Sequence, residues 1–474
     1  MSNHNKNHKV KARFCPSPTG LIHLGNARTA LFSALFAKKM DGVFLLRIED
    51  TDRERSKQEY ADILMQDLKW MGLEWQEGPD HDCGAGPYYQ AQRQFIYDDY
   101  YERLEVAGMA YPCFCSEEEL ALARKIQRAS GKPPRYPGTC RKLSDEQIAV
   151  KLSQGCQPTL RFKVLDDEWV EYEDFVRGKQ KFNSNDIGDF IIRRGDGTSP
   201  FMYVNAIDDS LMGVTHVMRG EDHITNTPRQ LMILAALGLR APQYGHISLI
   251  TGQDGSPLSK RNGSRSIEAL RLEGYLPEAV INYLARLGHY YGHDDLLSFN
   301  ELAMQFTLEG LSKSPAKFNL QQLNYWQKQA VSQLEVHVLW DWLADKEQQL
   351  VPEQHRQHFL ELVKPNIQHP HDLTHWVNII FGQQPEFNEI QKQVLQEAGE
   401  AYFVAALAAV EHYDYDVKQI TQYIADQVGI KGKKLYQPLR VALTSELHGP
   451  ELAQLISMMT LTDIKERLHN VKNI

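Results

Sequence analysis

The segment Pro16-Ser17-Pro18-Thr19-Gly20-Leu21-Ile22-His23-Leu24-Gly25-Asn26 follows a short apolar strand expected over residues 10–14 and opens a helix. Apolar residues recur at helical spacing from Leu24 to Leu35, so one helix face is expected to be apolar. A helix N-terminus carries unpaired N–H groups and the positive end of the helix dipole, which suit a polyphosphate. Gly25 has no Cβ to keep a nucleobase or ribose away, and His23 can donate hydrogen bonds to phosphate. The segment therefore predicts a nucleotide site.

A second segment, Pro257-Leu258-Ser259-Lys260-Arg261, places two cations in a loop that is punctuated by Gly252, Gly255 and Gly263. Glycine and proline at this density indicate a loop, and we expect its two cations to close over a triphosphate. Taken singly, the two segments are also compatible with a loop histidine and a solvated basic loop. Their order along one chain favours a shared nucleotide site.

The pair resembles the two signature motifs of class I aminoacyl-tRNA synthetases, with His23-Leu24-Gly25-Asn26 as the HIGH motif and Leu258-Ser259-Lys260-Arg261 as the KMSKS motif. The resemblance implies ATP and Mg²⁺ as ligands, and His23 and Lys260 as catalytic residues. The ATP-binding residues that it implies are Pro16, Thr19, His23, Gly25, Asn26, Glu221, Ser259, Lys260 and Arg261.

An acidic stretch, Glu49-Asp50-Thr51-Asp52, follows a buried parallel strand expected over residues 43–48. Ligands of open α/β sheets bind at the carboxyl ends of such strands. With its flanking arginines, the stretch resembles the signature of glutamyl-tRNA synthetases. In that family the residues matching Arg13 and Ser17 lie beside the amino acid, and the acid matching Glu49 contacts its α-ammonium group. A dicarboxylate substrate needs fixed cations, and arginine matches carboxylate geometry with two parallel hydrogen bonds.

A longer block, residues 205–223, resembles the family segment that completes the sheet and supplies Arg219 to the substrate carboxylate. The tyrosine that the family has seven residues before the first aspartate of this block is Phe201 here, and Tyr203 stands two residues later. Either the pocket has lost a hydroxyl contact or Tyr203 replaces it. The glutamate-binding residues that the resemblance implies are Arg13, Ser17, Glu49, Tyr203, Asn205 and Arg219.

The reaction that these parts imply needs no side-chain nucleophile. The α-carboxylate of L-glutamate attacks the α-phosphorus of ATP, which gives glutamyl-adenylate and pyrophosphate. The 2′-hydroxyl of the terminal adenosine of tRNA then attacks the adenylate. Positioning of aligned reactants contributes about 7–11 kcal/mol to such a step.

Three cysteines lie close together in the sequence: Cys113 and Cys115 form a Cys-x-Cys pair, and Cys140 follows 25 residues after Cys115. Three thiolates suit tetrahedral zinc. The resemblance extends to the insertion domain of some bacterial glutamyl-tRNA synthetases and of a shorter glutamyl-queuosine relative, in which a tyrosine matching Tyr136 is the fourth ligand. Lys142 occupies the position at which other relatives place a histidine or aspartate. The alternative is a remnant of a metal site that no longer binds zinc.

Composition limits the partners of the chain. Its net charge of −9 argues against indiscriminate nucleic-acid binding, so RNA contacts must use local basic surface. Two stretches without acids, residues 121–142 and 427–444, carry clustered Lys and Arg, which indicate either RNA contacts or solvated faces. The sequence contains no apolar run long enough for a membrane span. Scattered cysteines fit a reducing cytoplasm, and we expect a monomer.

The expected fold is α/β: a class I synthetase Rossmann-like, doubly wound parallel sheet, split by an insertion and followed by an all-α anticodon-binding half. The predicted divisions are a catalytic first half over 1–112, an acceptor-stem-binding insertion over 113–198, a catalytic second half over 199–255, the KMSKS loop with a stem-contact domain over 256–330, and a helical anticodon-binding domain over 331–474. The helical C-terminal half separates this chain from the related glutaminyl enzymes, which carry β-barrels there.

The sequence thus predicts a glutamate–tRNA ligase that acts on tRNA-Glu. A loose alignment puts Asn366 where bacterial relatives carry an arginine that separates tRNA-Glu from tRNA-Gln, so tRNA-Gln is a second predicted substrate, with a partner amidotransferase converting the product. Two other classes of protein are compatible with parts of the sequence. One is a small-molecule adenylate-forming ligase that never touches RNA, and the other is a catalytically inactive RNA-binding paralogue.

Overall fold

The computed structural model of the protein describes residues 9–471 except 53, 132, 257 and 259–264. The chain divides into two compact units. The first comprises Met1–Leu272 and Val280–Leu320, and the second comprises Glu273–Ala279 and Gln321–Ile474. No helix among the described residues is both long and apolar enough to span a bilayer.

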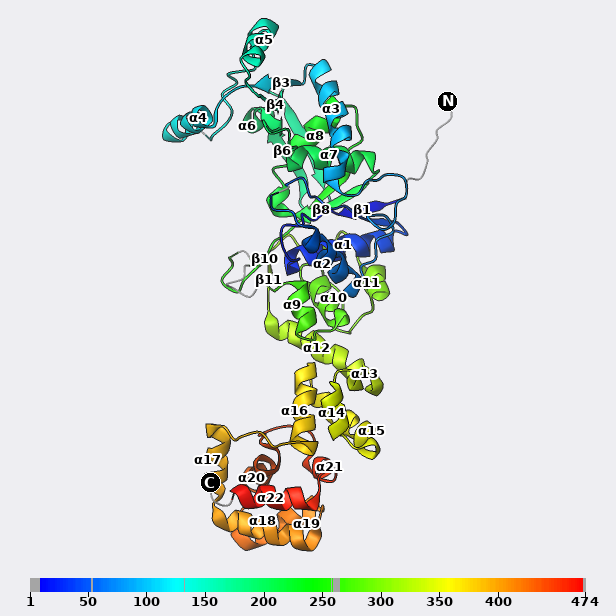
Figure 1. Cartoon of the computed structure of the whole chain (residues 1–474), viewed down its shortest axis with the longest axis vertical. Helices are drawn as coiled ribbons and strands as arrows, with labels where there is room; N and C mark the ends of the chain where they lie inside the picture. The colour runs from blue at the N-terminus through cyan, green and yellow to red at the C-terminus, as the bar shows by residue number, and fades with distance from the viewer. Residues whose placement is uncertain (1–8, 53, 132, 257, 259–264, 472–474) are drawn as a thin grey trace. The chain divides into compact units, whose positions relative to one another are not determined.

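The first unit is built on a six-stranded sheet in the order β2-β1-β8-β9-β5-β6 (Figure 1). The pairs β1–β2, β1–β8, β8–β9 and β5–β9 are parallel, whereas β6 runs antiparallel to β5 at the edge. The predicted parallel sheet is therefore confirmed, with one antiparallel edge strand added. The strands in chain order are β1 Lys11–Phe14, β2 Val43–Leu46, β5 Trp169–Asp174, β6 Gly178–Asn183, β8 His216–Gly220 and β9 Gln243–Ile247.

Helix α1 (Leu24–Lys39) begins at His23, which is its N-cap, as the first sequence segment predicts. Leu24, Ala27 and Leu31 are fully buried, so the expected apolar face packs in the core. The other helices of the catalytic part are α2 Gln58–Trp70, η1 Gln90–Arg93, α3 Gln94–Val106, α7 Phe201–Leu211, η2 Glu221–His223 and α8 Thr227–Ala236.

The predicted insertion contains a second, three-stranded sheet of β3 (Ala110–Cys113), β4 (Thr159–Phe162) and β7 (Phe190–Arg193), in which β4 pairs antiparallel with both neighbours. Its sequence range is not one separate body, because β5 and β6 belong to the main sheet. Helices α4 (Glu117–Ala129) and α5 (Asp145–Ser153) have no buried residue and project from the zinc-ligand candidates, while α6 (Ser184–Ile187) follows β6.

The remainder of the first unit follows the nucleotide segments. Strand β10 (Ile250–Thr251) pairs in parallel with β11 (Ala316–Lys317), and the backbone of Ile22 accepts a hydrogen bond from the N–H of Ile267. The helices here are α9 Ile267–Leu272, α10 Pro277–Arg286 and α11 Phe299–Gln305, of which α10 continues from the second unit.

The regular elements of the second unit are helices throughout its described residues, which confirms the expected helical half. A large apolar core that includes Phe359, Trp376, Tyr402, Leu439 and Ile464 holds them together. The helices are α12 Leu320–Gln333, α13 Val336–Trp340, α14 Asp345–Leu350, α15 Glu353–Val363, η4 Lys364–Asn366, α16 Pro370–Phe381, α17 Glu389–Ala398, α18 Glu400–Tyr413, α19 Val417–Val428, α20 Lys433–Thr444, α21 Leu452–Ile456 and α22 Leu461–Val471.

Candidate active site

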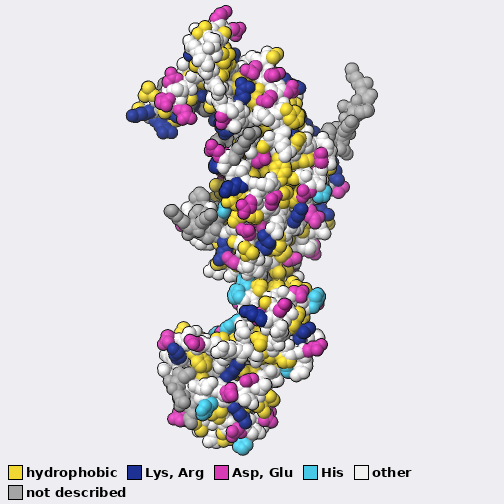
Figure 2. Space-filling model, in the orientation of Figure 1, with side chains coloured by type: hydrophobic (Ala, Val, Ile, Leu, Met, Phe, Trp, Pro, Cys, Tyr) yellow, Lys and Arg dark blue, Asp and Glu magenta, His cyan; other side chains and the backbone are white. Residues whose placement is uncertain are grey.

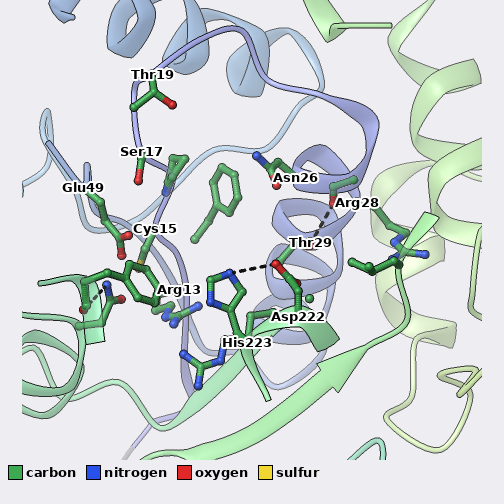
Figure 3. Close-up of a pocket in the computed structure, with 18 of the residues that line it drawn as sticks. Arg13, Cys15, Ser17, Thr19, Asn26, Arg28, Thr29, Glu49, Asp222 and His223 are labelled. Carbon is green, nitrogen blue, oxygen red and sulfur yellow. Dashed lines mark hydrogen bonds and ion pairs between the residues drawn. The ribbon is translucent and has the colours of Figure 1, made fainter. Parts of the chain in front are cut away.

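A cavity of about 410 Å³ lies beside the N-terminus of α1 and the carboxyl ends of β1 and β8. This volume is in the range of small-molecule sites. In Figure 3 the residues that follow β1 and those of α1 face Asp222 and His223 across the cavity. The lining residues are Arg13, Phe14, Cys15, Pro16, Ser17, Thr19, Gly25, Asn26, Arg28, Thr29, Glu49, Phe201, Asn205, Arg219, Gly220, Asp222, His223, Leu249 and Ile250.

Buried charged side chains lie in the wall of the cavity and directly behind it. Arg47 lies 2.9 Å from a carboxylate oxygen of Asp209 and donates a 2.8 Å hydrogen bond to the side chain of Asn205. Arg13 contacts the same Asp209 at 3.4 Å. Burial raises the pKa of Glu49 to about 7, against the lowering influence of Arg47 and Arg13. The arginines are therefore held in place by protein carboxylates, while Glu49 reaches the cavity.

Arg219 is held differently. Its Nη2 donates to the side-chain oxygens of Gln230 at 2.7 Å and of Thr227 at 2.8 Å, and its Nε lies 3.1 Å from Nε2 of His246. Its Nη1 is buried and has no hydrogen-bond partner. Burial lowers the pKa of Arg219 to about 10, which still leaves the guanidinium charged at neutral pH. A buried, unpartnered cationic donor in a cavity wall suits an incoming carboxylate.

Three further residues line the cavity although the sequence did not single them out. Arg28, on α1, is 2% exposed and donates to the backbone oxygens of Leu287 and Ser248. Asp222 and His223 follow β8, with 3.5 Å between a carboxylate oxygen and Nε2 (Figure 3). Arg28 lies two residues after Asn26, and Asp222 and His223 end the block of residues 205–223, so proximity to these segments is a signal that sequence analysis could have used.

The cysteine cluster comes together as predicted. The Sγ atoms of Cys113, Cys115 and Cys140 lie within 4.8 Å of one another. The hydroxyl of Tyr136 lies 3.3 Å from Sγ of Cys113 and 3.6 Å from that of Cys115. In a tetrahedral zinc site with Zn–S bonds of about 2.3 Å, sulfurs are about 3.8 Å apart. These three thiols and the phenol hydroxyl therefore fit a zinc ion.

Arg161 supports this cluster, because its guanidinium carbon lies 3.9 Å from the centre of the Tyr136 ring. Burial raises the pKa of the Cys113 thiol, but its contacts with Tyr136 and Arg161 outweigh burial and bring the value to about 7. Burial raises the pKa of the Cys115 thiol to about 11, so Cys113 is the more readily ionised of the two.

Basic side chains gather at the outer end of the projecting helix α4 (Figure 2). Arg124, Lys125 and Arg128 are exposed on the helix, together with the apolar side chains of Leu122 and Ile126. In the second unit, exposed Lys431, Lys433 and Lys434 form the other predicted basic stretch. The neighbouring Arg440 is partly buried and donates to the backbone oxygen of Pro450. Lys132 of the first stretch lies outside the described residues.

Comparison with known proteins identifies the family. Residues 9–325 match the family of "tRNA synthetases class I (E and Q), catalytic domain", and residues 319–472 match the "Anticodon binding domain" family. A "Glutamate--tRNA ligase 2" of Coxiella burnetii is 60% identical over 97% of this chain and 99% of its own length. The chain belongs to the glutamate–tRNA ligase family of class I aminoacyl-tRNA synthetases.

Further relatives of this glutamate–tRNA ligase family agree over the full length. A "Glutamate--tRNA ligase 2" of Nitrosococcus oceani is 51% identical over 97% of this chain and 98% of its own length. The crystal structure of a glutamate–tRNA ligase from Elizabethkingia meningosepticum, in complex with its amino acid, superposes with a TM-score of 0.85 at 28% identity. It covers 98% of this chain and 99% of the other.

Most of the residues that the glutamate–tRNA ligase resemblance implied line the cavity, but Tyr203 does not. Its hydroxyl donates to the backbone oxygen of Tyr97 at 3.0 Å, its ring stacks on Tyr101, and it is fully buried. The physical reason is helical spacing: Phe201 and Asn205, four residues apart on α7, share a face, whereas Tyr203 points elsewhere. Of the two alternatives, the structure favours a pocket without this hydroxyl, and Phe201 lines it.

Two other predicted ATP-binding residues stand beside the cavity rather than in its wall. His23 forms the N-cap of α1, and its backbone bridges to Ser266. Glu221 pairs with Arg177 and accepts a 3.1 Å hydrogen bond from the N–H of Leu249. The remaining predicted residues, Ser259, Lys260 and Arg261, lie outside the described residues.

Proposed function

We propose that the protein is a glutamate–tRNA ligase that activates L-glutamate with ATP and transfers it to the terminal adenosine of tRNA-Glu. The observation that carries the proposal is the pair of charges facing one cavity, the buried unpartnered Nη1 of Arg219 and the carboxyl group of Glu49. Arg219 suits one carboxylate of a ligand, and ionised Glu49 suits an ammonium group, so together they suit an amino acid. Arg13, in the same cavity wall, suits the second carboxylate of glutamate.

The chemistry follows from placement. The N-terminus of α1 and Gly25 form one wall, where ATP, as its Mg²⁺ complex, places its phosphates against unpaired N–H groups. The substrate carboxylate attacks the α-phosphorus, the bond to the bridging oxygen breaks, and pyrophosphate leaves. The ribose hydroxyl of the terminal adenosine then attacks the acyl carbon, and AMP leaves. The residues of the chain supply orientation and charge rather than a covalent bond.

Pyrophosphate exchange with glutamate, measured with and without tRNA, tests the proposal against both alternatives. Exchange that requires tRNA, together with charging of tRNA by labelled glutamate, supports it. Exchange without any tRNA supports a small-molecule ligase, and no exchange under either condition supports an inactive RNA-binding paralogue.

Zinc is the proposed structural ion of the insertion, with Cys113, Cys115, Cys140 and Tyr136 as ligands. The fit of their distances to a tetrahedral site supports it. The ion would tie the loops before α4 and α5, and we propose that α4 then presents its basic residues to the acceptor stem.

We also propose that the enzyme is a cytoplasmic monomer and that it accepts tRNA-Gln in addition to tRNA-Glu. The free thiols of all six cysteines support the reducing compartment. Exposed Asn366, at the end of η4, stands where an arginine is expected in discriminating relatives, which supports relaxed specificity. Light scattering at micromolar concentration checks the monomer.

A further inference from the structure

Arg219 and His246 are paired residues on neighbouring parallel strands. Arg219 of β8 lies opposite His246 of β9 in the register of the sheet, and Nε of the arginine is 3.1 Å from Nε2 of the imidazole. His246 is fully buried, and Arg219 is 5% exposed. The imidazole is thus part of the support of the guanidinium rather than of the cavity wall.

Asp174, at the end of β5, determines which ring nitrogen carries the proton. Its Oδ2 lies 2.5 Å from Nδ1 of His246. Its Oδ1 accepts hydrogen bonds from the backbone N–H groups of Val176, Arg177 and His246, at 2.9, 2.8 and 3.2 Å. A carboxylate held in this way requires the proton on Nδ1, which leaves Nε2 as an acceptor. Nε2 faces both the Nε–H of Arg219 at 3.1 Å and the hydroxyl of Thr227 at 3.0 Å.

The side chains that hydrogen-bond Arg219, those of Thr227, Gln230 and His246, are neutral, which leaves its charge available to a substrate carboxylate. Among the described residues, no carboxylate lies within ion-pair distance of Arg219, in contrast to Arg13 and Arg47, which contact Asp209. A carboxylate partner would hold the guanidinium but would also compete with the substrate. Burial lowers the pKa of His246 although Asp174 raises it, so the ring is neutral at neutral pH.

We propose that His246, with its tautomer set by Asp174, is a positioning residue that directs the unpartnered Nη1 of Arg219 to a carboxylate of glutamate. The proposal rests on the function proposed above. Asp174 contacts His246, and His246 contacts Arg219, so the guanidinium is oriented by a neutral ring and makes no ion pair that would compete with the substrate carboxylate. Neither His246 nor Asp174 lines the cavity.

Asp174→Asn tests the tautomer. The three backbone N–H groups retain the side-chain oxygen of the asparagine, so its NH₂ group faces Nδ1 and forces the proton onto Nε2. Nε2 then no longer accepts from the Nε–H of Arg219, and its N–H competes with Nη2 of Arg219 for the hydroxyl oxygen of Thr227. Because residues that orient a ligating side chain affect binding by about 10- to 100-fold in metal sites, we expect KM for glutamate to rise by about that factor. KM for ATP and for tRNA should stay within about twofold.

Variants of His246 provide the second measurement. His246→Leu removes the acceptor and should raise KM for glutamate as Asp174→Asn does. His246→Gln keeps a carbonyl oxygen within reach of Arg219, and its effect should be clearly smaller. His216→Gln is the matched control, since His216 lies at the opposite end of β8 and contacts Thr215 and Phe36. Circular dichroism of each variant verifies folding.

The outcomes are separable from those of the proposed function. If the wild-type protein does not charge tRNA with glutamate, the proposed function fails. If it does, and folded Asp174→Asn and His246→Leu keep KM for glutamate within about threefold, the positioning role is overturned. An equal rise in KM for glutamate and ATP also overturns it, because that pattern indicates a general disturbance of the sheet.

Discussion

Glu49 is 4% exposed and lies 3.7 Å from Arg47 at the end of the strand that leads into the cavity. Burial raises its pKa to about 7, so at lower pH the carboxyl group is neutral in the free enzyme. An ammonium group needs the ionised form. We therefore expect kcat/KM for glutamate to fall about tenfold per pH unit below about pH 7 and to level off above it.

The control for this pH dependence is KM for ATP, which should not follow the same titration. Glu49→Gln should flatten the acid limb and lower kcat/KM at all pH values. A wild-type profile that remains level down to about pH 5.5 would show that Glu49 does not bind the ammonium group as an ionised residue.

Lys260 is expected to contribute charge to the transition state rather than packing. Lys260→Ala should therefore leave the thermal unfolding temperature unchanged and reduce the rate of adenylate formation by about 10²–10³, by analogy with the loss of one oxyanion donor. Single-turnover adenylate formation measures this. A rate within about threefold of wild type would contradict the assigned role.

The sequence located individual cavity residues wherever a motif fixed the backbone. Ser17, Gly25 and Asn26 lie in the cavity wall because a strand, a turn and a helix N-terminus leave little freedom between them. Tyr203 was predicted wrongly from its residue type, because a tyrosine can replace the hydroxyl that Phe201 lacks. Its position on α7, two residues from Phe201, instead places its side chain in the core. The support of Arg219 by His246 was not predicted, because it depends on the register of two strands that are distant in sequence.

Among helices and strands too, features set by local sequence were predicted, and features set by pairing of distant segments were not. Strand β1, helix α1 and the helical unit were predicted from local periodicity. The hairpin of β5 and β6 falls within residues 113–198, the range predicted for the insertion. Its place in the main sheet depends on pairing with β9, which no local pattern shows.

Helices α4 and α5 are not held in place by a hydrophobic core, since neither has a buried residue. If zinc ties their bases, protein prepared without chelator should contain about one equivalent of zinc, and Cys115→Ser should lose it and lower the temperature of unfolding. Metal analysis by mass spectrometry measures the content. Cys156→Ser, at an exposed cysteine outside the cluster, is the matched control and should retain the ion.

Tyr136→Phe separates the role of the phenol in the same cluster. It should weaken zinc retention during dialysis against a chelator without abolishing binding, because three thiolates remain. Metal-free wild-type protein with full charging activity would rule out the structural zinc.

At the scale of the whole molecule, a nucleotide-binding unit and a helical unit with its own core are present in one chain. The match of residues 319–472 to an anticodon-binding family gives the second unit its task. A ligase for small molecules would not need it. The specificity for tRNA is therefore expected to depend on residues far in sequence from those that activate glutamate.

Asn366 is exposed at the end of η4, where discriminating relatives are expected to place an arginine. Loss of a guanidinium that reads a base edge removes about 1–3 kcal/mol of discrimination. We therefore expect kcat/KM for purified tRNA-Gln to be comparable with that for tRNA-Glu, and Asn366→Arg to shift the ratio toward tRNA-Glu by about tenfold. Gln354→Arg, which adds the same charge at an exposed position of α15, should leave the ratio unchanged. A wild-type preference for tRNA-Glu of about a thousandfold would refute relaxed specificity, since it far exceeds what the loss of one base contact permits.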